Sequence, residues 1–305
     1  MGQRGRKPDQ EDVAMNRIGV YYAFLAQSDS VDWHDCLDRA ARAGADALEV
    51  SAPKLHLLPK DQRTSIAQHA RDLGFSLTMA TALPPDADIS SDDEHVHEGG
   101  VEHLLRDIQL ATEMGVEVIG GILTGPSKHF PAGIEYTRWK ALENCIRGLS
   151  RIVASARMAN VIIGLEVANR FETPLVNTAL DALKVIEAVN DPVVGIHLDT
   201  FHMNIEEKNP ADAIRLAGKH LVHFHVCENN RALPGQAHIL WGDIFRALRD
   251  TAYKGSIVIE SLPGPYGSIA SRLNIWRRLS EDVDKELAIS IRFLREWIKE
   301  GNAVE

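Results

Sequence analysis

Cysteine is scarce in this sequence. Its 305 residues contain three cysteines, Cys36, Cys145 and Cys227, which are widely spaced and odd in number. Secreted domains held together by disulfides carry dense, paired cysteines, so this chain does not resemble a disulfide scaffold. Thiols without a pairing pattern are typical of a reducing compartment, and we therefore expect a cytoplasmic protein.

Long apolar runs and an excess of positive charge are also missing. No stretch approaches the about 18 consecutive apolar residues that indicate a membrane-spanning helix. The formal net charge is −10, and a negative field attracts neither nucleic acid nor an anionic membrane surface. We therefore expect no nucleic acid and no membrane as a partner, and a small-molecule ligand fits the charge better.

The first segment, MGQRGRKPDQEDVAMN, is polar and lacks the apolar centre of a secretory signal. We expect residues 1–16 to form a disordered tail, with Met15 as a plausible alternative start. The apolar fraction of the whole chain, 45%, allows a large core. No linker or break in composition divides the rest, so residues 17–305 are predicted to form one domain.

One phrase recurs along the chain: a helical stretch ends in glycine, asparagine or another small residue, and a short apolar run follows. It recurs in ARAGADALEV, RDLGFSLTMA, TEMGVEVIGG, ARMANVIIGLEV, AVNDPVVGIHLD, AGKHLVHFHV and AYKGSIVIE. The small residue takes the left-handed helix cap, and a continuous apolar run is typical of a strand covered on both faces. With RIGVYYAF near the start, these runs predict eight strands. We therefore predict an α/β fold, a single-domain (β/α)8 TIM barrel, with a doubly wound open sheet as the alternative.

Four consecutive predicted strands each deliver a side chain that can bind a metal. Glu166 lies near the end of VIIGLEV, Asp199 ends VVGIHLD, His225 lies in HLVHFHV and Glu260 ends SIVIE. The carboxyl ends of barrel strands meet at one rim, where the active sites of TIM barrels lie. One acidic residue at such a place is usually a helix cap or a surface charge. Four at one rim predict a common site.

Three carboxylates in a barrel mouth repel one another unless a cation lies between them. We therefore predict one divalent metal ion bound by Glu166, Asp199, His225 and Glu260. Carboxylate oxygens with a single imidazole form a harder donor set than thiolates or three imidazoles, which favours Mn²⁺, Co²⁺ or Mg²⁺. Glu172, His202 and Arg231 follow these ligands on the next loops, where a substrate's oxygens would lie. Taken singly, each of these three is typical of a surface salt bridge.

The segments LEVANRFE, LDTFHMNIEE, HFHVCENNR and IVIES resemble the signature segments of the ketose 3-epimerases, the family of the D-tagatose and D-psicose 3-epimerases. The resemblance runs from IGVYYAF to IWRRLS, near residue 275. It implies a TIM barrel, a homodimer or homotetramer, and one Mn²⁺- or Co²⁺-type ion on the four ligands above. It further implies that Glu172, His202 and Arg231 hold substrate oxygens O1 to O3, and that Glu166 and Glu260 exchange protons with the substrate.

Inverting a carbon beside a ketone requires that its proton leave one face and that a proton return to the other. Two opposed acid/base groups do this most directly, and Glu166 and Glu260 come from different strands. A metal chelated by O2 and O3 stabilises the enediolate charge as a Lewis acid. The hypothesis is C3 epimerisation of a free ketose, of the D-tagatose/D-sorbose, D-fructose/D-psicose or L-ribulose/L-xylulose type.

Some positions depart from the family. YYAFL stands where relatives have YYSYW or FYTYW, so Leu25 replaces a tryptophan, while Tyr21 and Phe24 resemble the apolar lining of the family's substrate pocket. Gly125 and Pro126 stand where some relatives have another tryptophan. We therefore expect a lower and less aromatic wall around C4 to C6, and the preferred ketose is left open. Cys227 is interpreted as a buried small hydrophobe rather than a fifth ligand.

Two histidine assignments complete the prediction: His223 belongs to the core or lies behind the ligands, and His95 and His97 belong to a solvated loop with the acidic run SSDDEH. A three-zinc endonuclease of the same superfamily would need further histidines in TMATAL and GGILTG, which have none. A hydroxypyruvate or aldose–ketose isomerase, or an inosose-type dehydratase, would use a similar metal and two glutamates. A binding protein with a structural metal would not need two opposed glutamates.

Overall fold

The computed structural model describes residues 16–84, 86–124 and 134–300. The predicted tail, apart from Asn16, and the positions of Gly125 and Pro126 lie outside the described residues. Asn16 is fixed, because its side-chain amide donates to the carbonyl oxygens of Tyr253 and Gly255 at 3.0 and 2.9 Å. Asn16 is therefore tied to the segment 253–255.

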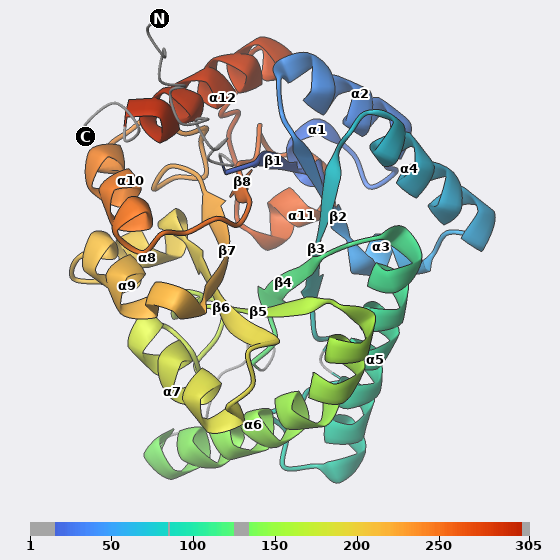
Figure 1. Ribbon diagram of the computed structural model, residues 1–305, viewed down its shortest axis with the longest axis vertical. Helices are drawn as coiled ribbons and strands as arrows, with labels where there is room; N and C mark the ends of the chain where they lie inside the picture. Colours follow the sequence, from blue (N-terminus) through green and yellow to red (C-terminus); the bar gives the residue numbers. More distant parts are fainter. Residues whose placement is uncertain (1–15, 85, 125–133, 301–305) are drawn as a thin grey trace, which may run out of the picture.

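The strands form one closed, parallel barrel in sequence order, which confirms the predicted TIM barrel over the open sheet (Figure 1). They are β1 (Ile18–Tyr21), β2 (Ala47–Ser51), β3 (Ser76–Ala82), β4 (Val118–Ile122), β5 (Ile162–Glu166), β6 (Val194–Asp199), β7 (Leu221–Val226) and β8 (Ile257–Ile259). β1 closes the barrel by pairing with both β2 and β8. Because the strands are parallel, all their carboxyl ends lie at the same rim.

Helices form a ring around the strands (Figure 1). They are α1 (Tyr22–Leu25), α2 (Trp33–Ala43), α3 (Ala52–His56), α4 (Lys60–Asp72), α5 (Glu94–Met114), α6 (Ile134–Ala159), α7 (Ala179–Val189), α8 (Thr200–Glu206), α9 (Pro210–Ala217), the 3₁₀ helix η1 (Gly218–His220), α10 (Trp241–Asp250), α11 (Gly267–Arg272) and α12 (Val283–Glu300). α12 contacts α2, α10 and β1, so the C-terminal helix completes the ring. Among the described residues, every helix is too short or too polar to cross a membrane.

The recurring pattern of a helix, a small residue and an apolar run has the structure predicted for it. Gly44, Gly115 and Asn190 follow α2, α5 and α7 with φ of 91°, 71° and 52°, the left-handed conformation that ends a helix and favours glycine and asparagine. Every residue of β2 and β6 is buried, because the barrel interior covers one face of each strand and the helices cover the other. The three cysteines are free and buried, in agreement with the absence of a disulfide framework.

Two local predictions were wrong. RIGVYYAF does not continue as a strand, because β1 ends at Tyr21 and Tyr22–Leu25 turn into the short helix α1. The acidic run before His95 is a helix start rather than a solvated loop, since the carboxylate of Asp93 accepts from the backbone N–H groups of His95 and Val96 and caps α5. His97 is consequently buried, and its Nε2 lies 3.1 Å from the carbonyl oxygen of Asn144 on α6.

Candidate metal and substrate site

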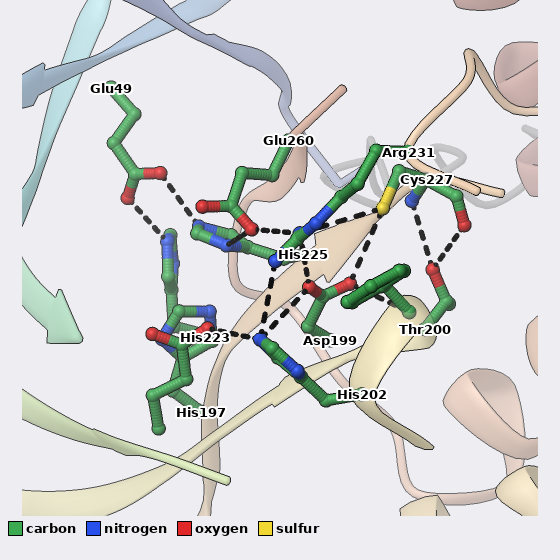
Figure 2. Close-up of polar contacts among 12 residues, drawn as sticks. Glu49, His197, Asp199, Thr200, His202, His223, His225, Cys227, Arg231 and Glu260 are labelled. Atoms are coloured by element: carbon green, nitrogen blue, oxygen red, sulfur yellow. Dashed lines mark hydrogen bonds and ion pairs between the residues drawn. The ribbon is translucent and has the colours of Figure 1, made fainter. Parts of the chain in front are cut away.

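The carboxyl ends of β5, β6, β7 and β8 bring four distant residues together. Glu166 and Asp199 are the last residues of β5 and β6, His225 lies in β7, and Glu260 directly follows β8. The N–H of Glu260 donates to the carbonyl oxygen of Val226 at 3.1 Å, which holds Glu260 beside β7. One potential ligand atom from each of the four residues lies within 4.8 Å of the others, and Figure 2 shows three of them, Asp199, His225 and Glu260. The predicted set therefore converges on one point.

A cavity of about 300 Å³ opens above this cluster and lies at the low end of the range for small-molecule sites. Its polar lining comes from opposite sides of the rim. Glu166, His225 and Glu260 lie on it with the substrate-binding candidates Glu172, His202 and Arg231, while Tyr21, Tyr22, Ser51, Lys54, Ser268 and Arg272 line it as well. The cavity can therefore present metal ligands and further polar groups to one small molecule.

The buried carboxylates repel one another. Burial, and then the charge of Glu260, raises the pKa of Glu166 well above its usual value. Burial also raises the pKa of Asp199, although the Arg231 guanidinium opposes this effect. Burial raises the pKa of Glu260 too, but the charges of Arg231 and His225 outweigh it and lower that pKa overall. A divalent cation in the cluster would compensate charges that one arginine compensates only in part.

The donor set fits a divalent ion. Three carboxylates and one imidazole are ligands of the kind that manganese, cobalt or magnesium sites use. The buried Nδ1 of His225 faces the cluster and lies 3.3 Å from Glu260 Oε2. Burial lowers the pKa of His225, but the charges of Glu49 and Glu260 outweigh burial and raise it well above its usual value, so a metal ion would bind Nδ1 in place of a proton. Cys227 is not one of the four: its Sγ lies 3.8 Å from Asp199 Oδ1, and burial raises the pKa of its thiol well above the usual value. The structure therefore agrees with the interpretation of Cys227 as a small buried side chain.

His202 is held in one orientation at the edge of the cavity. It lies in α8 rather than in a loop, and its Nδ1 accepts from the backbone N–H of Asn169 at 3.2 Å. Acceptance at Nδ1 favours the tautomer with its proton on Nε2, which lies 3.6 Å from Glu166 Oε1 and 3.9 Å from Glu172 Oε1. Nε2 also lies 3.4 Å from Nη2 of Arg231, a group that can only donate, so this contact is not a hydrogen bond in that tautomer. Burial and the charge of Arg231 lower the pKa of His202 well below its usual value, so the ring is neutral. His202 can therefore donate one hydrogen bond into the cavity.

Arg231 connects the cluster to the substrate side. Its Nη1 donates to Asp199 Oδ2 at 2.8 Å and to Glu260 Oε2. The guanidinium carbon lies 4.1 Å from the centre of the Phe201 ring. Its backbone has φ of 66°, an uncommon value for a residue with a β-carbon. The turn is held by Glu228, whose backbone carbonyl accepts from Arg231 N at 3.0 Å.

Glu228 and Asn169 are positioning residues that sequence reasoning missed. The buried carboxylate of Glu228 accepts from the backbone N–H groups of Gly235 and Ile239 and from Trp241 Nε1, so it fixes the loop that carries Arg231. Each could have been suspected only as a polar residue inside a recognised motif, because the motif does not show its partner: those of Glu228 lie 7 to 13 positions further along the chain, and that of Asn169 lies in α8.

The predicted lining near the first strand needs a correction. Tyr21 borders the cavity, but Phe24 and Leu25 do not. Because the chain turns into α1 at Tyr22, both side chains pack in the hydrophobic core and are almost fully buried. The wall on this side is formed instead by Tyr22 and by polar or charged side chains from α3 and α11, among them Lys54 and Arg272.

Glu49 is a fully buried acidic residue near the site, and it was not predicted. It lies in the middle of β2, and its Oε1 and Oε2 lie 2.8 Å from His223 Nε2 and 2.6 Å from His225 Nε2 (Figure 2). Burial raises the pKa of Glu49, but the two imidazoles outweigh burial and lower the pKa to about 2. His223 therefore lies behind the ligand cluster, which is one of the two positions predicted for it.

Comparisons with known proteins agree with this geometry. The profile of the family described as Xylose isomerase-like TIM barrel matches residues 37–297. The chain is 32% identical to a D-psicose 3-epimerase of Enterocloster bolteae, over 91% of this chain and 92% of that protein. It is 33% identical to an L-ribulose 3-epimerase of Mesorhizobium japonicum, over 88% and 89% of the two chains.

Solved structures show the same relationship. The structure of D-psicose 3-epimerase with D-tagatose from Clostridium cellulolyticum H10 superposes with a TM-score of 0.87 at 30% identity, covering 92% of this chain and 99% of that chain. A structure of 3-keto-D-glucoside 4-epimerase from E. coli is more distant, with a TM-score of 0.74 at 21% identity, and shares the fold.

Proposed function

Because the chain belongs to the ketose 3-epimerase family of xylose isomerase-like TIM barrels, isomerases that act on carbohydrates, we propose that it inverts C3 of a free ketose with the help of one divalent metal ion. One observation carries the proposal. Glu166 and Glu260 reach one cavity from β5 and β8, and both belong to a four-residue cluster of potential metal ligands. Removing a proton from one face of a carbon and returning one to the other face requires two titratable groups, and these two lie beside the same potential metal site.

The metal ion would be held by Glu166, Asp199, His225 and Glu260, with Mn²⁺ as our first choice and Co²⁺ or Mg²⁺ as alternatives. When bound, it would supply Lewis-acid stabilisation of negative charge on the substrate oxygens. Glu166 and Glu260 then exchange a proton with C3 from opposite faces of the sugar. Asp199 is a ligand only, because both of its oxygens accept hydrogen bonds, Oδ1 from Phe201 N and Oδ2 from Arg231 Nη1, whereas Glu260 accepts from Arg231 through Oε2 alone.

Three residues orient the C1 to C3 end of the sugar in this proposal. The Nε2–H of His202 and the guanidinium of Arg231 donate hydrogen bonds to substrate oxygens, and Glu172 accepts one from a hydroxyl. The Asn169 contact to His202 and the Glu228 contacts around Arg231 support these roles, since both donors are fixed before the substrate binds. We further propose that the enzyme works in the cytoplasm as a homodimer or homotetramer.

The test is product identity. The protein is incubated with Mn²⁺ and, separately, with D-fructose, D-tagatose and L-ribulose, and the sugars are separated by chromatography. A C3 epimer of at least one ketose is the expected product. Hydroxypyruvate and an inosose are incubated in parallel. Formation of an aldose, conversion of hydroxypyruvate, or loss of water from the inosose would instead identify the alternative isomerase or dehydratase. No conversion in any of these assays would overturn the proposal of an enzyme.

Arg272 should affect the far end of the substrate. It lies at the end of α11, lines the cavity, and has no hydrogen bond or ion pair within the described chain. We expect Arg272→Ala to raise KM for a ketohexose about three- to tenfold with a smaller effect on kcat, because one hydrogen bond is worth about 0.5–1.5 kcal/mol. Steady-state kinetics with a ketohexose and a ketopentose measure the effect.

The ketopentose should be affected less, because it lacks the C6 hydroxyl. Arg277→Ala is the matched control: Arg277 is exposed on the following segment and does not line the cavity. An unchanged KM in Arg272→Ala, or an equal change for both sugars, would place the specificity determinant elsewhere on the wall.

A further inference from the structure

Glu49 is an ionisable residue in a layer of the barrel that is usually apolar. It lies in β2, is fully buried, and does not line the cavity. TIM-barrel interiors are filled mostly by branched apolar side chains, and a buried carboxylate is costly unless it is paired. The partners of Glu49 come from β7, across the barrel, and from Thr78 on β3, which donates to its Oε1 at 3.2 Å. The carboxylate therefore connects three strands inside the barrel.

The contact with His225 bears directly on the ligand cluster. Glu49 Oε2 lies 2.6 Å from Nε2 of His225, while the other ring nitrogen, Nδ1, lies 3.3 Å from Glu260 Oε2 (Figure 2). The contact at Nε2 is an ion-pair contact whose angle departs from that of an ideal hydrogen bond. A neutral imidazole binds a metal through one nitrogen and keeps its proton on the other. A carboxylate at Nε2 therefore leaves the lone pair of Nδ1 for the metal.

The surroundings hold Glu49 in this place. Its other oxygen accepts from His223 Nε2 at 2.8 Å, so the carboxylate cannot rotate away from His225 without losing a second partner. Gly120 on β4 makes room for the imidazoles: a β-carbon there would lie 2.8 Å from His197 Nδ1 and 3.1 Å from His223 Cδ2. The arrangement of Glu49, His223 and His225 is thus built into four strands.

The same region offers a second group of potential ligands, formed by His197, His223 and His225. Glu49 argues against a metal ion there, because its two oxygens already lie against the Nε2 atoms of His223 and His225. Nδ1 of His225 lies beside the carboxylate cluster, 3.3 Å from Glu260 Oε2, while Nδ1 of His197 lies further away, 4.0 Å from Glu166 Oε2. The acidic cluster at the rim is therefore the favoured metal position. The contacts of Glu49 with two of the histidines disfavour the histidine group as a metal site.

We infer that Glu49 is a positioning residue that sets the metal affinity of the site, by fixing the ring orientation and the protonated nitrogen of His225. This inference rests on the proposed metal site. It assigns Glu49 no contact with the sugar, since the residue does not line the cavity. A carboxylate on the second nitrogen also makes an imidazole a stronger donor, and loss of such a partner typically weakens metal binding about 10- to 100-fold.

The experiment compares wild-type protein with Glu49→Gln, which keeps the shape of the side chain and removes its charge. Both proteins are stripped of metal and titrated with Mn²⁺, and the free ion is measured by electron paramagnetic resonance. We expect Mn²⁺ to bind Glu49→Gln about 10- to 100-fold more weakly. The visible absorption of bound Co²⁺ should also change, because the geometry of the imidazole ligand changes. Epimerase activity at low Mn²⁺ should fall and recover largely at saturating Mn²⁺.

Thr78→Val is the matched control, since it removes a hydrogen bond to Glu49 and leaves the contact with His225 intact. Its Mn²⁺ affinity should stay within a factor of about three of wild type, because Thr78 contacts Glu49 at the oxygen that faces His223 and does not touch His225. If Glu49→Gln does not fold, Glu49→Asp takes its place: the shorter carboxylate cannot reach both imidazoles, and the same loss of affinity is expected.

Equal Mn²⁺ affinity in wild type and in the Glu49 variant, with only a lower melting temperature, would overturn the inference and make Glu49 a structural ion pair. The titration uses no sugar. A wild-type protein that binds Mn²⁺ but converts no ketose would therefore refute the epimerase proposal and leave the role of Glu49 standing.

Discussion

Glu260→Gln is expected to lower the rate of epimerisation by about two to four orders of magnitude, the usual contribution of a general acid or base. Glutamine keeps an oxygen for the metal but cannot take up or release the proton. Metal content should therefore fall only modestly while turnover is lost. Inductively coupled plasma analysis of bound metal and a chromatographic rate assay measure the two effects on the same sample.

A finer result follows from the positions of the two glutamates. With one base left, Glu260→Gln should still exchange the C3 proton of one epimer with solvent, so deuterium enters that sugar from D₂O while no product forms. Glu166→Gln should show the same behaviour with the other epimer. Mass spectrometry of the recovered sugars detects the label.

Glu117→Gln is the control for the loss of a carboxylate as such, because Glu117 is exposed and forms only a 3.6 Å ion pair with Arg17. Near wild-type epimerisation by either active-site variant with its metal bound would contradict the two-base mechanism. Exchange of the same epimer by both variants would contradict it as well, and His202 would then be the next proton carrier to test.

Removal of the metal is expected to abolish turnover and to lower the melting temperature. The carboxylates of Glu166, Asp199 and Glu260 converge in one buried cluster, and the only cation that contacts two of them in the described chain is Arg231. A ligand that binds only the folded state stabilises it by about 2.7 kcal/mol at 100 times its Kd. Saturating Mn²⁺ should therefore raise the melting temperature by several degrees.

The measurement is a chelation and add-back series. EDTA-treated, dialysed protein is assayed alone and with Mn²⁺, Co²⁺, Mg²⁺, Zn²⁺ or Ca²⁺, by rate and by thermal unfolding. Mn²⁺ or Co²⁺ should restore the rate, whereas Ca²⁺, which prefers more oxygen ligands, serves as a divalent control. Full turnover in metal-stripped protein would end the metal hypothesis.

Most of the architecture could be predicted from local sequence. Glycine or asparagine at the ends of α2, α5 and α7 takes the left-handed conformation because of its own chemistry, and the apolar runs that follow can only be strands covered on both sides. Once the strands are parallel and consecutive, Glu166, Asp199 and Glu260 must lie at one rim. The convergence of the cluster was thus predictable without any knowledge of distances.

Predictions of local structure were wrong where a bend of the chain or a single capping side chain changed the conformation. Phe24 and Leu25 were placed on the cavity wall, but the chain bends into α1 after Tyr21 and both enter the core. His97 was placed in a loop, but the Asp93 carboxylate caps α5, which begins at Glu94, three residues before His97. In both cases the composition of the segment was compatible with either outcome, and packing decided.

The sequence by itself determined the barrel, the common rim and the residue types that meet there, because each depends on patterns within one strand, helix or turn. Only the tertiary structure decided which groups support them. Glu49 meets His223 across 174 positions of sequence, and Asn169 meets His202 across 33. These contacts depend on the register and curvature of strands that are far apart in the chain, and a glutamate within an apolar run, as in ALEVS, carries no local sign of its partner. The physical reason is that a buried charge is stabilised by partners on other strands of the barrel, whereas the tendency to form a strand depends mainly on the residues of that strand.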